Sequence, residues 1–110
     1  MKAVYIAGPM RDYPNYNFDA FDEAKSEVTK LGYHPVSPAD MDRMYEGWGK
    51  YAPEGWAPSE EDKLRMINRD LAAISGCSSV YMLRGWEKSA GTLVELAYAR
   101  FLGKEVIFQP

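Results

Sequence analysis

The chain has 110 residues, with 16 acidic and 13 basic side chains and a formal net charge of -3. This length supports one hydrophobic core and is too short for two. The acidic balance, without any basic run, argues against a long nucleic acid as partner. One cysteine excludes an internal disulfide, and with one histidine it cannot form a His/Cys zinc site. We therefore expect a single domain over residues 1–110, without metal or cofactor.

The first apolar run predicts the central strand of a parallel sheet. Ala3 to Ala7 is apolar throughout and is closed by Gly8 and Pro9, as in a strand buried on both faces. The run is too short for a signal peptide or a membrane span, so we expect a cytoplasmic protein with no membrane contact. Arg11 follows the strand at the end where open α/β sheets bind ligands. It either holds an anion there or is a solvated loop charge.

A helix and a second strand follow. Asn17 is a candidate cap for a helix that runs to about Leu31, where Gly32 ends it. Residues 33–36 form a short strand, and Ser37 to Asp40 are expected to be a loop.

Residues 41–58 combine many aromatic side chains with glycines and prolines and show no sustained helical or strand period. The segment is expected to be a long irregular insertion, which in a compact domain is usually functional or disordered, and its aromatic content argues against disorder. Two interpretations remain open. The segment is a lid whose rings stack on a flat ligand such as a nucleobase, or it is an apolar patch that docks a second subunit.

The second half of the chain alternates helices and strands. Ser59 caps a helix that ends at Gly76, residues 78–83 form a strand, a helix runs from Ser89 to Gly103, and residues 105–108 form the last strand. The fold class is therefore α/β, with a small open parallel sheet of four to five strands and flanking helices, of the Rossmann or flavodoxin-like kind.

Two carboxylates in these helices are candidates for chemistry. Glu95 is the only charged residue between Ser89 and Ala99, on a helix that is apolar nearly all round, so no cation within one turn neutralises it. It either sits at a solvent edge or is a buried functional group. Asp70 lies close to the apolar stripe of its helix, or else pairs with Arg69 or Arg65 at the surface. Ser89 and Gly91 leave the first turn of the Glu95 helix open to an anion.

These motifs, in this order, resemble the nucleoside 2-deoxyribosyltransferase superfamily. They are Tyr5-Ile6-Ala7-Gly8-Pro9-Met10-Arg11, Arg69-Asp70-Leu71, Val80 to Leu83, and Ser89-x-Gly-Thr-x-x-Glu95 followed by Gly103-Lys104 and a strand. The resemblance covers most of the chain except the aromatic segment. It is closest to short members, which include deoxynucleoside 5'-monophosphate N-glycosidases and small uncharacterised proteins of bacteria and their phages.

The resemblance implies a role for each matching residue. Glu95 is the expected nucleophile at the anomeric carbon, and Asp70 the carboxyl that helps protonate the departing base. The residues expected to bind substrate are Tyr5, Gly8 and Met10 around the sugar, with Arg11, Ser89 and Gly91 at a 5'-phosphate. Nucleoside-specific transferases carry an acid at the position of Ser89, and a hydroxyl there suits a phosphate better. Pro9 departs from the hydrolases, which have a small hydroxyl residue there, and it removes a backbone donor.

The expected function is therefore hydrolysis of the N-glycosidic bond of a nucleoside 5'-monophosphate. Alternatives are a deoxyribosyltransferase that moves the sugar between bases, a non-catalytic nucleotide-binding module, and a structural oligomer. The expected partner is a small nucleotide or nucleoside, and the resemblance implies a homo-oligomer, commonly a dimer.

Overall fold

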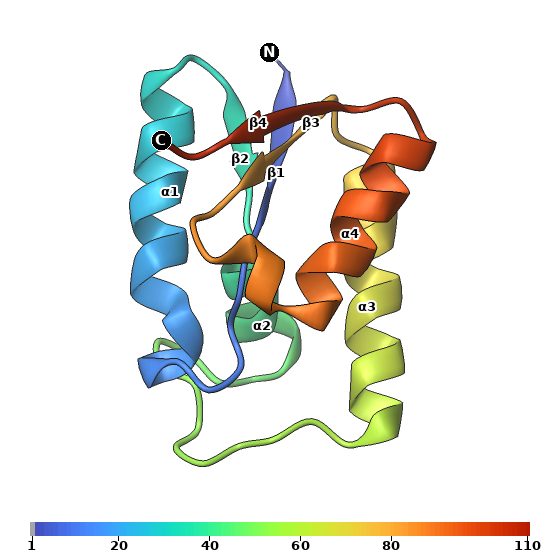
Figure 1. Ribbon diagram of the computed structural model, residues 1–110. Helices are drawn as coiled ribbons and strands as arrows, with labels where there is room; N and C mark the ends of the chain where they lie inside the picture. Colours follow the sequence, from blue (N-terminus) through green and yellow to red (C-terminus); the bar gives the residue numbers. More distant parts are fainter. Residues whose placement is uncertain (1) are drawn as a thin grey trace.

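The sheet is four-stranded and entirely parallel. The computed structural model describes residues 2–110, with strands β1 (Ala3–Ala7), β2 (His34–Val36), β3 (Ser79–Met82) and β4 (Glu105–Phe108) in the spatial order β2-β1-β3-β4 (Figure 1). All three strand pairs are parallel. The expected open parallel α/β sheet with β1 at its centre is confirmed, in a Rossmann-like arrangement.

Helices cover both faces of this sheet. Helix α1 (Phe18–Lys30) lies on one face, and α3 (Glu60–Ser75) and α4 (Ala90–Phe101) lie together on the other (Figure 1). Alternate residues of β1 serve the two sides: Val4 and Ile6 pack with α1, whereas Tyr5 and Ala7 pack with the residues of α3 and α4. The side-chain direction along β1 therefore places Tyr5 under α4.

Local sequence signals account for most helix ends. Ser59 forms a capping box with Asp62 at the start of α3, and Ser89 Oγ accepts the Thr92 N–H at the start of α4. Helix α1 differs from expectation, because Asn17 has a left-handed backbone and makes no side-chain cap. Its Nδ2 instead donates to the Pro9 carbonyl at 2.7 Å, which ties the loop after β1 to the helix start.

Helix α2 (Pro38–Tyr45) follows β2, where a loop over residues 37–40 was expected. It also shortens the irregular segment from its N-terminal side. Ser37 caps this helix by accepting the Ala39 N–H at 3.2 Å, and Pro38 occupies its first turn, where proline is favoured. Arg43 then anchors the helix to α1 by a two-pronged pair with Asp22. The serine and proline that suggested a loop are instead the cap and the first turn of this helix.

The remaining aromatic segment folds onto its own chain. Trp48 and Trp56 lie 4.8 Å apart between ring centroids, and Tyr16 packs edge-on against both. Tyr16 belongs to a turn in which Asn15, Tyr16 and Asn17 all have positive φ, and Asn15 Oδ1 accepts the Ala52 N–H. The two tryptophans are half-buried in this contact. No helix within residues 2–110 is long and apolar enough to cross a membrane.

Candidate active site

The two candidate carboxylates meet where the strand order changes direction. The chain runs from β1 outward to β2 and then returns to β3 on the other side of β1. In open α/β sheets, ligands bind at the carboxyl ends of strands beside such a point. Tyr5 comes from β1, Asp70 from α3 and Glu95 from α4, so three separate elements supply the site.

Glu95 is a buried carboxyl with one oxygen held by a tyrosine. Its exposed fraction is 6%, and Tyr5, which is fully buried, donates its hydroxyl to Glu95 Oε2 at 2.5 Å. Helix geometry explains the burial, since Glu95 lies on the same face of α4 as the buried Thr92 and Ala99. The hydrogen bond occupies Oε2 and fixes the carboxyl plane, while Oε1 remains available to a reacting atom.

Burial controls the protonation of this pair. Desolvation, followed by the negative charge of Asp70, raises the pKa of Glu95 to about 8, although the Tyr5 hydrogen bond and Arg69 oppose the shift. Desolvation and the nearby Glu95 and Asp70 charges likewise raise the pKa of Tyr5 well above its usual value. Tyr5 therefore remains a hydrogen-bond donor at neutral pH.

Asp70 lies in an ion-pair network rather than at an exposed surface. Arg69 donates from Nε and Nη2 to Asp70 Oδ1 at 3.0 and 2.9 Å, and Nη2 also reaches Asp42 Oδ1 on α2 at 2.7 Å. The Asp70 side chain is 15% exposed and that of Asp42 is fully buried. Both expectations for Asp70 are thus met in part: it pairs with Arg69, and it does so beside the buried site.

The pKa values of these two acids are raised despite the arginine. Desolvation raises the pKa of Asp70 to about 6, while Arg69 and the nearby Tyr5 hydroxyl act in the opposite direction. Desolvation also raises the pKa of Asp42 to about 6 against the pull of Arg69. The negative charge of Asp70 raises the pKa of Glu95. The two titrations therefore depend on each other, and the pKa values belong to the pair.

The N-terminus of α4 offers hydrogen-bond donors near the pair. Ser89 Oγ uses a lone pair for the Thr92 N–H and keeps its own O–H free to donate. Gly91 is exposed, and a Cβ built there would meet nothing within 4 Å. Arg11 is exposed in the loop after β1, and within residues 2–110 no ion pair includes it. These groups could hold an anion.

Gly8 and Met10 have packing roles that account for their residue types. A Cβ at Gly8 would lie 2.7 Å from Leu83 Cβ, so only glycine lets the ends of β1 and β3 approach this closely. Met10 is half-buried against the α1 side of the core. Both residues lie at the carboxyl end of β1, and the packing of Gly8 holds that end against β3.

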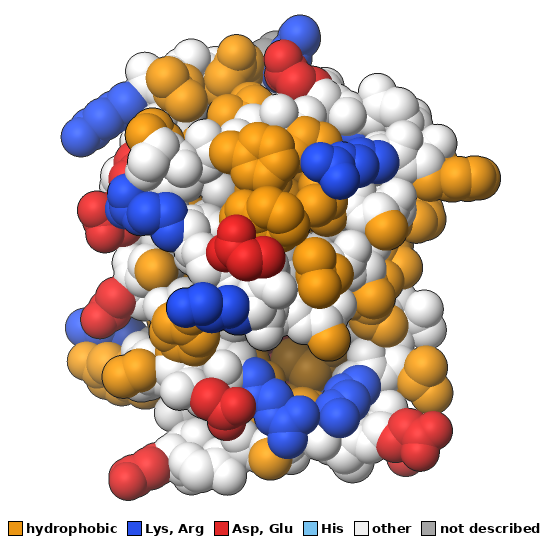
Figure 2. Space-filling model, viewed as in Figure 1, with side chains coloured by type: hydrophobic (Ala, Val, Ile, Leu, Met, Phe, Trp, Pro, Cys, Tyr) orange, Lys and Arg blue, Asp and Glu red, His pale blue; other side chains and the backbone are white. Residues whose placement is uncertain are grey.

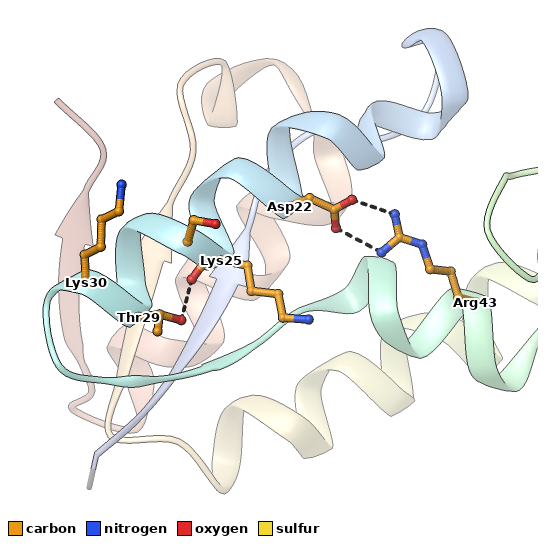
Figure 3. Close-up of a pocket in the computed structure, with 6 residues that line it drawn as sticks. Asp22, Lys25, Thr29, Lys30 and Arg43 are labelled. Atoms are coloured by element: carbon orange, nitrogen blue, oxygen red, sulfur yellow. Dashed lines mark hydrogen bonds and ion pairs between the residues drawn. The ribbon is translucent and has the colours of Figure 1, made fainter.

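The surface is hollowed beside these elements. Figure 2 shows a depression just below the N-terminal end of α4, with hydrophobic side chains at its floor and Lys or Arg side chains along its lower rim. Two other depressions are lined by residues of α1 and α2; both include Asp22 and Arg43, and the one drawn in Figure 3 also includes Lys25. None of the candidate site residues lines either depression. Both depressions are open and carry charged side chains of both signs, so we interpret them as filled by solvent.

Sequence reasoning missed two members of the site, Arg69 as an internal cation and Asp42 altogether. Arg69 was considered only as a surface partner of Asp70, and Asp42 fell inside the segment interpreted as irregular. The Ser37-Pro38 pair was the available signal, because a cap followed by proline predicts a helix start. A helix from residue 38 would have placed Asp42 on a defined face.

Solved structures of other proteins share this fold. A 2-deoxyribosyltransferase from Leishmania mexicana matches with a TM-score of 0.65 and 21% identity, over 98% of this chain and 63% of that one. A 2-deoxyribosyltransferase from the psychrotolerant bacterium Bacillus psychrosaccharolyticus, described as a biocatalyst for nucleoside synthesis, matches with a TM-score of 0.63 and 21% identity, over 96% and 70%. The chain therefore has the fold of the 2-deoxyribosyltransferases, at less than two thirds of the length of the Leishmania enzyme.

The family itself follows from the sequence model that matches residues 2–108. That model is described as a domain of unknown function, DUF4406, and the chain belongs to this family. A search of curated proteins found no significant match.

Proposed function

We propose that this protein hydrolyses the N-glycosidic bond of a nucleoside 5'-monophosphate, with Glu95 as nucleophile and Asp70 as general acid and base. The observation that carries the proposal is the buried Glu95 carboxyl, fixed by Tyr5 and coupled to Asp70 at the switch point of the sheet. Breaking such a bond places positive charge on the sugar and negative charge on the base. A carboxylate and a proton donor answer those two needs.

The two steps balance within this pair. In the first, a Glu95 oxygen bonds to the anomeric carbon, the bond from that carbon to the base nitrogen breaks, and the Asp70 proton passes to the base. In the second, water attacks the same carbon and gives its proton to Asp70, and the Glu95 carboxylate leaves. Net retention is expected, as in glycosidases that form a glycosyl ester. If a second base replaces water, the reaction becomes a transfer.

Phosphate binding rests on the donors near α4. The free Ser89 hydroxyl, the open first turn at Gly91 and the exposed Arg11 support a site for a dianion. An acid at the position of Ser89 would repel that dianion. Transfer between bases is the second candidate, because both solved structures described above are of 2-deoxyribosyltransferases.

The direct test is base release. Purified protein is incubated with ribo- and deoxyribonucleoside 5'-monophosphates and the matching nucleosides, with and without a second free base, and free base is separated by chromatography. Release from monophosphates alone is expected, with a loss of about 1,000-fold or more in Glu95→Gln because the nucleophile is removed. Glu87→Gln, an identical change at an exposed residue in the loop before α4, is expected to retain activity.

The other outcomes decide between the alternatives. Release that requires a second base identifies a transferase. If no base is released from any substrate, and a nucleotide raises the Tm of the wild type and Glu95→Gln equally, the chain is a binding module and Glu95 is not a nucleophile.

We also propose that the chain acts as a homodimer through the outer face of α4. Leu93, Val94 and Phe101 are exposed by 43%, 48% and 86% and lie on one side of the helix with Ala97. Figure 2 shows hydrophobic side chains along the side of the molecule formed by α3 and α4. An exposed apolar stripe of this kind typically marks a protein–protein interface. Sedimentation should give a dimer for the wild type and a monomer for Phe101→Glu; a monomeric wild type would contradict this.

A further inference from the structure

The contact between Arg69 and Asp70 has an unusual geometry for neighbours in a helix. Consecutive residues of an α-helix point about 100° apart, so their side chains do not ordinarily face each other. Arg69 nevertheless directs both Nε and Nη2 at one oxygen of Asp70, at 3.0 and 2.9 Å. The arginine side chain must therefore fold back along α3, and something must hold it in that position.

Asp42 supplies that hold from a different helix. Its Oδ1 accepts Arg69 Nη2 at 2.7 Å, so one guanidinium nitrogen bridges two carboxyls. The Asp42 side chain is fully buried and its Oδ2 has no hydrogen-bond partner; Arg69 Nη1 also makes no hydrogen bond, although Glu46 Oε2 lies 3.9 Å from it. A buried carboxylate that is only partly paired costs stability, and an apolar residue of similar size would not. The position is therefore poorly explained by packing alone.

Each of the two carboxyls proposed to react is held by a neighbour through one of its oxygens. Tyr5 engages Oε2 of Glu95, and Arg69 engages Oδ1 of Asp70. In each carboxyl one oxygen is fixed by a neighbour and the plane of the group is set, which leaves the other oxygen for substrate. Reacting groups that are held in place lose less freedom on reaching the transition state.

We infer that Asp42 and Arg69 are positioning residues: Asp42 orients the Arg69 guanidinium, which fixes Asp70 so that its second oxygen can deliver a proton to the departing base. The effect of this role on catalysis rests on the proposed glycosidase function. The orientation of Asp70 by the two residues is a property of the folded chain and can be measured separately.

Arg69→Lys separates geometry from charge. Lysine keeps the positive charge but offers a single ammonium in place of the planar fork. We expect kcat to fall about 10- to 100-fold with little change in KM, because Asp70 is displaced and substrate binding groups are not. The pH limits of the activity should remain near those of the wild type. Asp42→Asn should lower kcat by about 10-fold, because the amide holds the arginine less firmly.

Arg43→Lys is the matched control. Arg43 also makes a forked pair with an aspartate, through Nη1 and Nη2 to Asp22 at 2.9 and 2.8 Å (Figure 3), but it faces α1 rather than the site. The same chemical change there should leave kcat within about twofold of the wild type. If Arg69→Lys retains full kcat, or if Arg43→Lys loses as much, the positioning role is wrong.

A second measurement does not depend on turnover. In Asp42→Asn the arginine is held less firmly, so Asp70 loses part of its pairing with Arg69 and should titrate at a higher pH when followed by carboxyl carbon NMR, whereas removal of the Asp42 charge alone would lower that pH. Asp40→Asn on the outer side of α2 should leave that titration unchanged. An Asp70 that is unshifted or titrates at a lower pH in a folded Asp42→Asn protein overturns the inference. If the wild type releases no base at all, the proposed function fails, and the NMR result still decides whether Asp42 and Arg69 control Asp70. If Asp42→Asn does not fold, Arg69→Lys supplies the same NMR test, because loss of the fork should change the Asp70 titration.

Discussion

At the scale of single residues, the function of the site depends on which of its acids holds a proton. Asp42, Asp70 and Glu95 lie around one internal cation, Arg69, and burial disfavours the ionised form of each acid. Full ionisation would leave excess negative charge in a poorly solvated region. The chain therefore holds at least one proton among these acids at neutral pH, which is the state that an attacking carboxylate beside a proton donor requires.

The coupled pair predicts a bell-shaped dependence of kcat/KM on pH. Below about pH 6 both Glu95 and Asp70 carry protons, so no carboxylate is free to attack; above about pH 8 both are ionised, so the proton for the base is lost. Between these limits the pair holds one proton, which rests on Glu95 and must pass to Asp70 before Glu95 attacks. Activity should peak near pH 7. Tyr5 stays protonated and Arg69 stays cationic through this range, and Asp42 titrates near the acid limb.

Asp70→Asn tests the assignment of those limbs. A substrate phosphate also titrates near pH 6, so the acid limb alone does not identify an enzyme group. Without the Asp70 charge, the pKa of Glu95 should fall below its wild-type value and the acid limb should report Glu95 alone, while the alkaline limb disappears and the maximal rate drops about 100- to 10,000-fold. A wild-type rate that keeps rising above pH 9 would contradict the role of Asp70.

At the scale of elements, residues with strong local signals were predictable. The β1 run closed by Gly8, the Ser59 capping box and the Ser89 cap each produced the expected element. Helix α2 was missed because it is only 8 residues long and because its stability comes from Ser37, Pro38 and the contact of Arg43 with α1. Contacts between distant elements leave little trace in a local pattern.

The same limit applies to the site. The isolated charge of Glu95 in an apolar helix was visible in the sequence, and the structure places it in the interior. Its hydrogen bond to Tyr5, which is 90 positions away in the chain, follows only from strand order and from the face of β1 that Tyr5 occupies. Asp42 could not be assigned because its role depends on how α2 meets α3.

At the scale of the whole molecule, the buried acids of the candidate site lower the stability of the fold. The parallel sheet order brings β1, α3 and α4 together at the switch point, and the residues that meet there include buried acids instead of apolar groups. Functional groups of this kind commonly lower stability because selection retains them for activity. The penalty should depend on pH, since it applies to the ionised form.

Glu95→Gln should therefore make the protein more stable at alkaline pH. The folded pKa of Glu95, about 8, exceeds its ordinary value of 4.5, so the folded chain keeps a proton that the unfolded chain releases between these values. The free energy of unfolding must then fall as pH rises from about 4.5 to 8, by at most about 5 kcal/mol at ~1.4 kcal/mol per pKa unit. Glutamine keeps the shape and can accept the Tyr5 hydroxyl without carrying a charge. Urea denaturation from pH 4 to 9 should give similar stabilities for both proteins near pH 4 and a growing advantage for Glu95→Gln above pH 6, with Glu87→Gln following the wild type. A Glu95→Gln protein that is less stable than the wild type at pH 9 would show that the ionised Glu95 is well accommodated, and the explanation of its reactivity by burial would then fail.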